Sequence, residues 1–446
     1  MSSSATITGY AEGYYGRLLS WDQRARLLDT LRETGGNFYL YAPKDDDYHR
    51  FNWRTPYPDD WRENFRTFAT KAKTHDKKIQ IVAGLSPGID FDFSQIDNGR
   101  DYQLLCDKAQ QLLSDGACAI ALMFDDIDAD FEQRCGAFDD EGMAHAELAN
   151  RLYYSIKNFQ HKTIDSDNQE QHTRKLCYAV PRIYANELVD GSDSSLISDG
   201  LQHRNRRYLH TFLDKLDTDI DWFYCGNEII AKEPSADNLK NLLQSDATHL
   251  FATLDKKSET TSRLPASPNR IVIWDNYYAN DYCPRRLFLG PWVGRERCVN
   301  IVINPTGLVH TDQLLIRIVA ACRDPALSDI ERHDKWYQCL VEAQVPEAFQ
   351  RIKHYFNAPT FSDNRDNEES NQTIPDTKSV SENKRQTELD ALEQLLWRWK
   401  SPLAREWYPY LLGLKHDLLL EANNMSELRI QKTQTSPLAS RLTNSN

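Results

Sequence analysis

The 446-residue sequence has no long apolar run and a deficit of positive charge. Its longest apolar stretches, such as Ile120–Phe124 (IALMF), have the length of a core strand. A bilayer-spanning helix needs roughly 18–20 such residues. The 53 basic and 66 acidic residues give a formal net charge of −13, so the dense basic face that nucleic acid or an anionic membrane requires is missing. We expect neither as a partner.

Paired cysteines are also missing. The nine cysteines are scattered, odd in number and never spaced as C-x-x-C. This is typical of buried free thiols in a reducing compartment rather than of disulfides or structural zinc. The residues after Met1 (SSSAT) supply neither the basic nor the apolar part of a secretory signal. Together these features predict a cytoplasmic protein.

The Gly-rich patterns G-x-G-x-x-G and G-x-x-x-x-G-K-[ST] are absent, which disfavours an open nucleotide-binding sheet. Instead, short apolar runs alternate with segments of helical spacing. The runs are residues 7–13, 37–41, 79–85, 118–124, 176–180, 220–225, 271–274 and 299–303. Strands that are apolar on both faces and alternate with helices form parallel sheets covered on both sides. Eight such units predict an α/β fold, a (β/α)8 TIM-type barrel, followed by a C-terminal all-helical region.

Helix signals punctuate this pattern and divide the chain. Ser20 and Gln23 fit a capping box, and Gly35-Gly36 ends the helix that they begin. A polar run with almost no apolar residues separates two helical parts near the C-terminus. We predict a catalytic barrel over 1–325, a helical segment over 326–360, a polar disordered linker over 361–387, a helix pair over 388–423 and a disordered tail over 424–446. The aromatic residues of the helix pair predict packing on the barrel or on another chain, as in a homodimer.

Two adjacent carboxylates, Asp125 and Asp126, follow the fourth predicted strand. Barrel enzymes keep their chemistry at this end of the strands. Neighbouring carboxylates that are partly buried repel each other, so one pKa is expected to rise and give an acid beside an ionised partner. A solvated loop start is the alternative. A calcium loop is excluded because Phe131 and Ala137 stand where Gly and Glu are required, but magnesium-dependent phosphoryl transfer stays open.

Other strand ends carry groups that suit a sugar. Amide, carboxylate and ammonium groups form hydrogen bonds to pairs of sugar hydroxyls, and aromatic rings pack against the C–H faces of a sugar. Glycines let the backbone approach a ligand closely. The residues concerned are Gly13, Lys44, Trp274, Asn276, Asp281 and Asn304. Together they predict a carbohydrate pocket.

Six sequence blocks resemble glycoside hydrolase family 84, the β-N-acetylglucosaminidases that include protein O-GlcNAcases and enzymes labelled hyaluronidases. The resemblance covers roughly residues 7–350, with the blocks in family order. The blocks are Glu12–Arg17 (EGYYGR), Tyr39–Asp46 (YLYAPKDD), Leu85–Gly88 (LSPG), Phe124–Ile127 (FDDI), Trp274–Asn276 with Asn280–Tyr282 (WDN, NDY) and Arg286–Pro291 (RLFLGP).

The resemblance implies retaining, substrate-assisted hydrolysis of terminal β-linked GlcNAc, in which the 2-acetamido oxygen attacks C1 and forms an oxazoline. Asp125 would hold the acetamido N–H, and Asp126 would act as acid and then base. Tyr184 would bond the acetamido oxygen, Asn276 would steady the group and Trp274 would wall its pocket.

The ring hydroxyls would be held by Gly13 (through its carbonyl), Lys44, Asp281 and Asn304. The resemblance implies no metal or organic cofactor. The implied partner is a GlcNAc-containing glycoside or glycoprotein substrate, and acidic polyanions fit the acidic chain less well than a neutral sugar does.

The chain departs from the family at two places. Leu18-Leu19 replaces a usual Pro-Trp, and Arg182-Ile183 replaces Thr-Glu in the segment that ends in Tyr184. Two other functions stay open at this point: a non-catalytic GlcNAc-binding protein and a metal-dependent phosphohydrolase that uses the Asp-rich segment.

Overall fold

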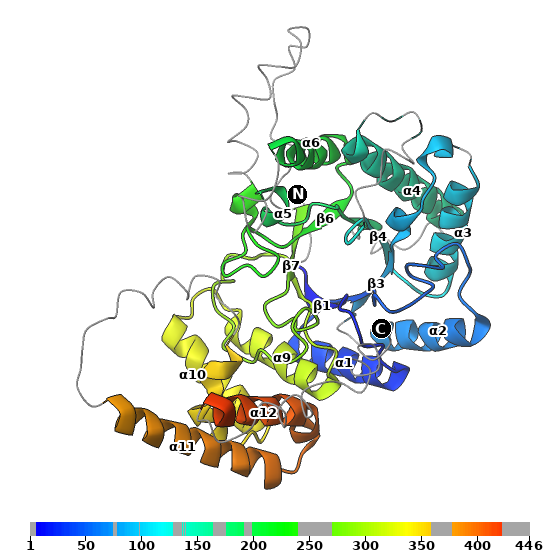
Figure 1. Cartoon of the computed structure of the whole chain (residues 1–446). Coiled ribbons are helices and arrows are strands. Elements are labelled where there is room, and N and C mark those ends of the chain that lie inside the picture. The colour runs from blue at the N-terminus through cyan, green and yellow to red at the C-terminus, as the bar shows by residue number, and fades with distance from the viewer. Residues whose placement is uncertain are drawn as a thin grey trace, which may run out of the picture. The chain divides into compact units, whose positions relative to one another are not determined.

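The structure, a computed structural model, describes residues 6–74, 78–97, 99–127, 136, 138, 140–163, 175–190, 199–239, 270–357 and 377–421. Eight strands pair in parallel and in sequence order into one closed barrel (Figure 1). This confirms the (β/α)8 TIM-type fold. The strands are β1 (Thr8–Glu12), β2 (Phe38–Tyr41), β3 (Gln80–Leu85), β4 (Ala119–Met123), β5 (Cys177–Val180), β6 (Asp221–Tyr224), β7 (Ile271–Asp275) and β8 (Ile301–Ile303).

Helices surround this barrel, as Figure 1 shows for α1 to α4 and α6. The first begins as the sequence predicts, because the Ser20 and Gln23 side chains cap each other's backbone N–H and Gly35 ends it at φ 80°. Counting those of the C-terminal region, the helices that the structure describes are α1 (Trp21–Thr34), α2 (Asp59–Lys73), α3 (Arg100–Ser114), α4 (Glu141–Thr163), α5 (Glu187–Asp190), α6 (Asp199–Lys215), α9 (Val309–Cys322), α10 (Asp329–Glu342), α11 (Thr377–Trp397) and α12 (Pro402–Glu421).

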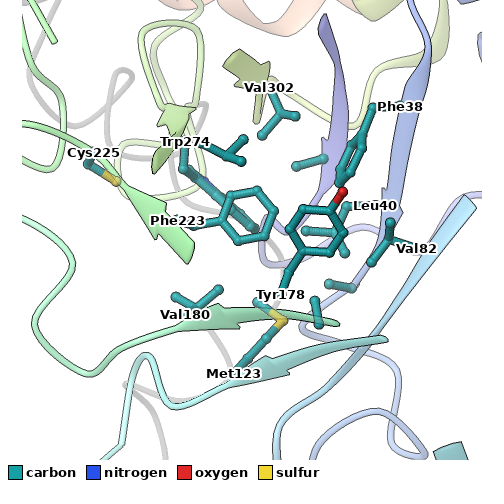
Figure 2. Packing of buried hydrophobic residues seen from close by; sticks show 14 of the residues in the cluster. Phe38, Leu40, Val82, Met123, Tyr178, Val180, Phe223, Cys225, Trp274 and Val302 are labelled. Atoms are coloured by element: carbon teal, nitrogen blue, oxygen red, sulfur yellow. The ribbon is translucent and has the colours of Figure 1, made fainter. Parts of the chain in front are cut away.

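The barrel interior is filled by alternate residues of each strand, because successive side chains of a strand point to opposite faces. Figure 2 shows the aromatic rings of this core. The rings of Phe38 and Tyr178 meet edge to face with centroids 5.4 Å apart, and Phe223 packs in the same way against Trp274 at 5.5 Å. Trp274 therefore joins the core to the carboxyl end of β7.

The chain divides into two compact units. The first contains Met1–Ala279, Val293–Val309 and Arg323–Ala326, and with them all eight strands. The second contains Asn280–Trp292, His310–Cys322 and Leu327–Asn446. Nearly all of α9 thus groups with the C-terminal helices, although the predicted barrel extends to residue 325.

A carboxylate from α12 explains why α9 belongs to the second unit. Leu308 at the N-cap of α9 offers no side-chain acceptor. Glu406 accepts the backbone N–H groups of His310 (3.0 Å) and Thr311 (2.8 Å) instead. An anion at a helix N-terminus also complements the helix dipole. The Trp407 indole N–H donates to the Thr311 hydroxyl at 3.0 Å, which completes the link between α9 and α12.

Helix α11 begins at Thr377, within the range 361–387 predicted as a linker. Residues 358–376 lie outside the described residues, as does the predicted tail from residue 424. The sequence over 377–387 has no apolar periodicity, but Lys384, Arg385 and Gln386 have good helix propensity. In the described part of the chain, no helix is long and apolar enough to cross a membrane.

A buried lysine supports the loop between β2 and α2. Lys108, on α3, is 3% exposed and donates to the Thr55 carbonyl, and its ammonium lies 3.9 Å from the centroid of the Tyr57 ring. Burial lowers the pKa of Lys108 to about 7, against the opposing attraction of Asp46. The loop that carries Lys44 therefore rests on an ammonium that loses its charge near neutral pH.

Lys108→Met should change how stability depends on pH. Between pH 7 and 10 the unfolded chain binds one proton more at Lys108 than the folded chain, so this group's contribution rises with pH by about 1.4 kcal/mol per unit. Below pH 7 both states are protonated and the contribution is constant. Urea unfolding from pH 6 to 9 should show the wild type gaining roughly 2–3 kcal/mol over the variant above pH 7. The same change at the exposed Lys400 is the control.

Candidate active site

A buried carboxylate and a buried ammonium meet where β2 and β4 end. Asp125 is 7% exposed, Lys44 is 3% exposed, and the Lys44 ammonium donates to Oδ2 of Asp125. The neighbouring charges of Asp125 and Asp126 raise the pKa of Lys44 against the effect of its burial. The other Asp125 oxygen, Oδ1, is buried without a hydrogen-bond partner in the described part of the chain. Such an acceptor is costly unless a ligand donates to it.

Asp126 points its carboxylate into a ring of donors. Its backbone has φ 54°, in the left-handed region that is uncommon for residues other than glycine. Tyr15 donates to Oδ2 at 2.8 Å, Tyr184 donates to Oδ1 at 3.2 Å, and the Lys44 ammonium lies 3.4 Å from Oδ2. Arg50 donates to the Asp126 carbonyl at 2.6 Å. The strained backbone is thus held by side chains from the ends of β1, β2 and β5.

The charges around Asp126 reverse the pKa shift that the sequence led us to expect for a partly buried carboxylate pair. Burial acts to raise the pKa of Asp126, but the Lys44 ammonium, the hydrogen bond from Tyr15 and the charge of Arg50 together hold it below its usual value. Burial raises the pKa of the Tyr15 hydroxyl, which keeps its proton for this bond. At neutral pH Asp126 is therefore an ionised carboxylate.

Four of the other residues predicted for the site form a second cluster. The Asn276 side-chain oxygen accepts from the Trp274 indole N–H at 3.0 Å and from the Asn304 amide at 2.9 Å. The Asn304 oxygen in turn accepts the backbone N–H of Gly13 at 3.1 Å. The Asn276 amide donates to the Ile229 carbonyl at 3.0 Å. These bonds fix the ends of β1, β7 and β8 relative to one another.

Asn276 uses its polar atoms within the protein. Its oxygen accepts two hydrogen bonds, and its two amide hydrogens face the Ile229 carbonyl and the Cys225 sulfur, the latter at 3.6 Å. In this arrangement Asn276 orients Trp274 and Asn304. Its predicted contact with an acetamido group stays a prediction, and that contact would have to replace one of these bonds.

Gly13→Ala should damage this cluster. A Cβ at Gly13 would lie 2.3 Å from Cζ2 of Trp274, so the ring or the strand end must move. Overpacking of this kind costs about 1–3 kcal/mol, and displacement of Trp274 should lower activity as well. Thermal unfolding and hydrolysis rates measure the two effects. Gly16→Ala is the matched control, because a Cβ there meets nothing within 4 Å and only its φ of 79° is strained.

The departure at Arg182 leaves Tyr184 in place. The Arg182 guanidinium donates to both oxygens of Glu141, at 2.9 and 2.7 Å, and so does not enter the site. The Tyr184 carbonyl accepts the Cys225 N–H at 2.8 Å, and its hydroxyl reaches Asp126. Asp281 belongs to the second unit, where its carboxylate accepts the backbone N–H of the next residue. Its predicted contact with a ring hydroxyl stays a prediction.

Tyr15 and Arg50 both donate hydrogen bonds to Asp126, although neither was among the predicted site residues. Tyr15 lies inside one of the six blocks, and Arg50 follows Lys44 by six residues. Both residues follow barrel strands, β1 and β2, and this position is the sequence signal that could have identified them. No group of three or more metal-ligating side chains occurs among the described residues, and Asp128 and Asp130 of the Asp-rich segment lie outside them.

Comparison with known proteins identifies the family of this chain. A family model described as beta-N-acetylglucosaminidase matches residues 8–355. The protein O-GlcNAcases of Rattus norvegicus and Mus musculus are 30% and 29% identical over 323 residues, which is 70% of this chain. The chain spans only 29% of the length of each relative. The family match over most of the chain confirms the resemblance seen in the sequence: the chain belongs to the beta-N-acetylglucosaminidase family of glycoside hydrolases.

Proposed function

We propose that this chain is a retaining exo-β-N-acetylglucosaminidase that removes terminal β-linked GlcNAc by substrate-assisted catalysis. The observation that carries the proposal is the buried Oδ1 of Asp125, which has no hydrogen-bond partner among the residues that the structure describes. A buried carboxylate oxygen needs a donor, and the N–H of a 2-acetamido group supplies one. Because Lys44 already occupies Oδ2, Oδ1 would accept this N–H, and the bond would orient the acetamido oxygen towards C1.

Asp126 would serve the leaving group. It would protonate the glycosidic oxygen while the acetamido oxygen forms a bond to C1, and the C1–O bond to the aglycone breaks. Water would then open the oxazoline at C1 and give its proton to Asp126, which returns GlcNAc with retained configuration. The Tyr184 hydroxyl, now on Asp126 Oδ1, could turn to the acetamido oxygen.

The lowered pKa of Asp126 belongs to a carboxylate that water still reaches. Its side chain is still 32% exposed. A bound sugar would cover that surface and remove water, and burial already acts to raise this pKa. We therefore expect the substrate itself to bring Asp126 towards the protonated form that an acid requires.

The substrate class would be a neutral terminal GlcNAc on protein or on a small glycoside. The protein O-GlcNAcases that resemble the chain support the first, and the excess of acidic residues disfavours polyanionic glycans. A homodimer through residues 388–423 and a cytoplasmic location stay predictions. Light scattering of the purified chain would test the first, and imaging of the tagged chain in cells the second.

An aryl β-GlcNAc substrate tests the proposed activity. We expect turnover between pH 5 and 8, unchanged by EDTA, with β-GlcNAc as the first product seen by NMR. Calorimetric binding of GlcNAc without turnover at any of these pH values would favour a binding protein. Loss of activity in EDTA would favour the metal-dependent alternative.

Asp125→Asn should lower turnover on good and poor leaving groups alike, since its role lies at the acetamido group.

A further inference from the structure

One tyrosine hydroxyl links the two strand ends that carry Asp126 and Tyr184. The hydroxyl of Tyr208, a buried residue on α6, accepts the backbone N–H of Arg182 at 2.8 Å. It also lies 3.0 Å from Nδ1 of His145 on α4. Because a hydroxyl has one hydrogen to give, accepting from Arg182 leaves it free to donate to His145. A single oxygen thus joins the segment after β5 to α4.

From His145 the contacts continue to the catalytic carboxylates. The His145 ring stacks on Phe124 with centroids 4.0 Å apart and 3° between the planes. Phe124 is fully buried, directly precedes Asp125-Asp126, and donates its backbone N–H to the Val180 carbonyl at 2.9 Å. Movement of the His145 ring would therefore move the backbone from which both carboxylates project.

The Arg182 side of this linkage is held by a buried ion pair. Besides its two bonds to Glu141, Arg182 donates to Asn205 Oδ1 at 3.2 Å and lies 4.7 Å from the centroid of the Tyr208 ring. The side chains of Arg182 and Glu141 are 10% and 7% exposed. A bidentate pair of this kind fixes orientation as well as distance. Tyr184 follows Arg182 by two residues, so the ion pair of Arg182 also restrains the backbone of Tyr184.

We propose that Tyr208 is a positioning residue, whose hydroxyl sets the spacing between the Tyr184 hydroxyl and the Asp126 carboxylate. The inference rests on the proposed function, because this spacing matters only if both groups act on one sugar. The Tyr184 hydroxyl and the Asp126 carboxylate are 3.2 Å apart. A displacement of about 1 Å in a catalytic group can cost about 100-fold in rate.

Tyr208→Phe tests the proposal, because it removes one oxygen and keeps the ring beneath Arg182. With an activated aryl β-GlcNAc we expect kcat to fall about 10- to 100-fold, while KM changes less than about threefold. Tyr153→Phe is the matched control. Tyr153 is also a buried tyrosine, on α4, and its hydroxyl donates to Asp219 at 2.7 Å. Its variant should keep kcat within about twofold of wild type.

Measuring kcat of Tyr208→Phe in a Tyr184→Phe protein distinguishes a positioning role of Tyr208 from a general loss of stability. In Tyr184→Phe, one of the two groups whose spacing Tyr208 sets is already gone, so adding Tyr208→Phe should cost clearly less than it costs in the wild type. Equal losses in both backgrounds, or a near-normal kcat of Tyr208→Phe alone, would overturn the inference. If Tyr208→Phe does not fold, Glu141→Gln is measured in the same two backgrounds. No turnover by the wild type would overturn the proposed function and this inference together, whereas wild-type turnover with an unaffected variant overturns the inference alone.

Discussion

Asp126→Ala should lose activity on poor leaving groups far more than on activated ones. An alkyl or peptidyl aglycone cannot leave as an oxyanion, so it needs the proton that Asp126 would supply. An activated aryl group leaves without one. We expect kcat/KM to fall about 10³-fold or more for a poor leaving group and much less for an activated aryl group. A series of aryl β-GlcNAc substrates with graded phenol pKa values measures this directly.

Two further features of that series would support the assignment. Azide should rescue Asp126→Ala on activated substrates, because a small anion can attack the oxazoline without a general base. Asp125→Ala gives a matched comparison from the neighbouring position and should show a loss that depends little on the leaving group. Equal losses for Asp126→Ala across the whole series would contradict its role as the acid.

The barrel could be predicted from the sequence because the signal is local. Each strand is apolar on both faces, and each helix segment carries its own start and stop, as Ser20 and Gly35 show for α1. The positions of Asp125 and Lys44 followed from the same pattern, since the carboxyl ends of parallel strands meet at one end of a barrel. No single long-range contact had to be known.

The partners of these residues could not be predicted, because they depend on contacts distant in sequence. Arg50 reaches the Asp126 carbonyl across 76 positions, and Arg182 reaches Glu141 across 41. The sequence marks Arg182 as a departure from the family but does not say where its side chain goes. The direction of the Asp126 pKa shift depends in the same way on charges brought in from another strand, chiefly Lys44.

The boundaries of the C-terminal region show another limit. Helix α11 begins at Thr377, inside a run that has no apolar periodicity, and α9 takes its N-terminal cap from Glu406. Apolar spacing predicts the part of a helix that is buried, not the solvated turns before it. It also cannot show which distant carboxylate will cap a helix.

Lys44→Met should shift the pH dependence of the reaction as well as lower its rate. In the wild type the Lys44 ammonium lies 3.4 Å from Asp126 Oδ2 and holds the pKa of Asp126 down. Without it, fewer groups oppose the effect of burial, so this pKa should rise. An acid works when protonated, so kcat falls as pH rises through the pKa that the acid has in the enzyme–substrate complex. That fall should move to higher pH in the variant.

The size of the rate loss and the shift of the limb report different roles of Lys44. Removing the ammonium also leaves Asp125 without its buried counter-charge, which should cost about 3–5 kcal/mol in the free energy of unfolding. Lys44→Arg keeps the charge and should leave the limb near its wild-type position even if the rate falls. A lower rate in Lys44→Met with an unmoved alkaline limb would mean that Lys44 serves the sugar hydroxyls alone. If the alkaline limb moves in Lys44→Met, the Lys44 ammonium also sets the proton affinity of Asp126, because the substitution removes no other charge that faces Asp126.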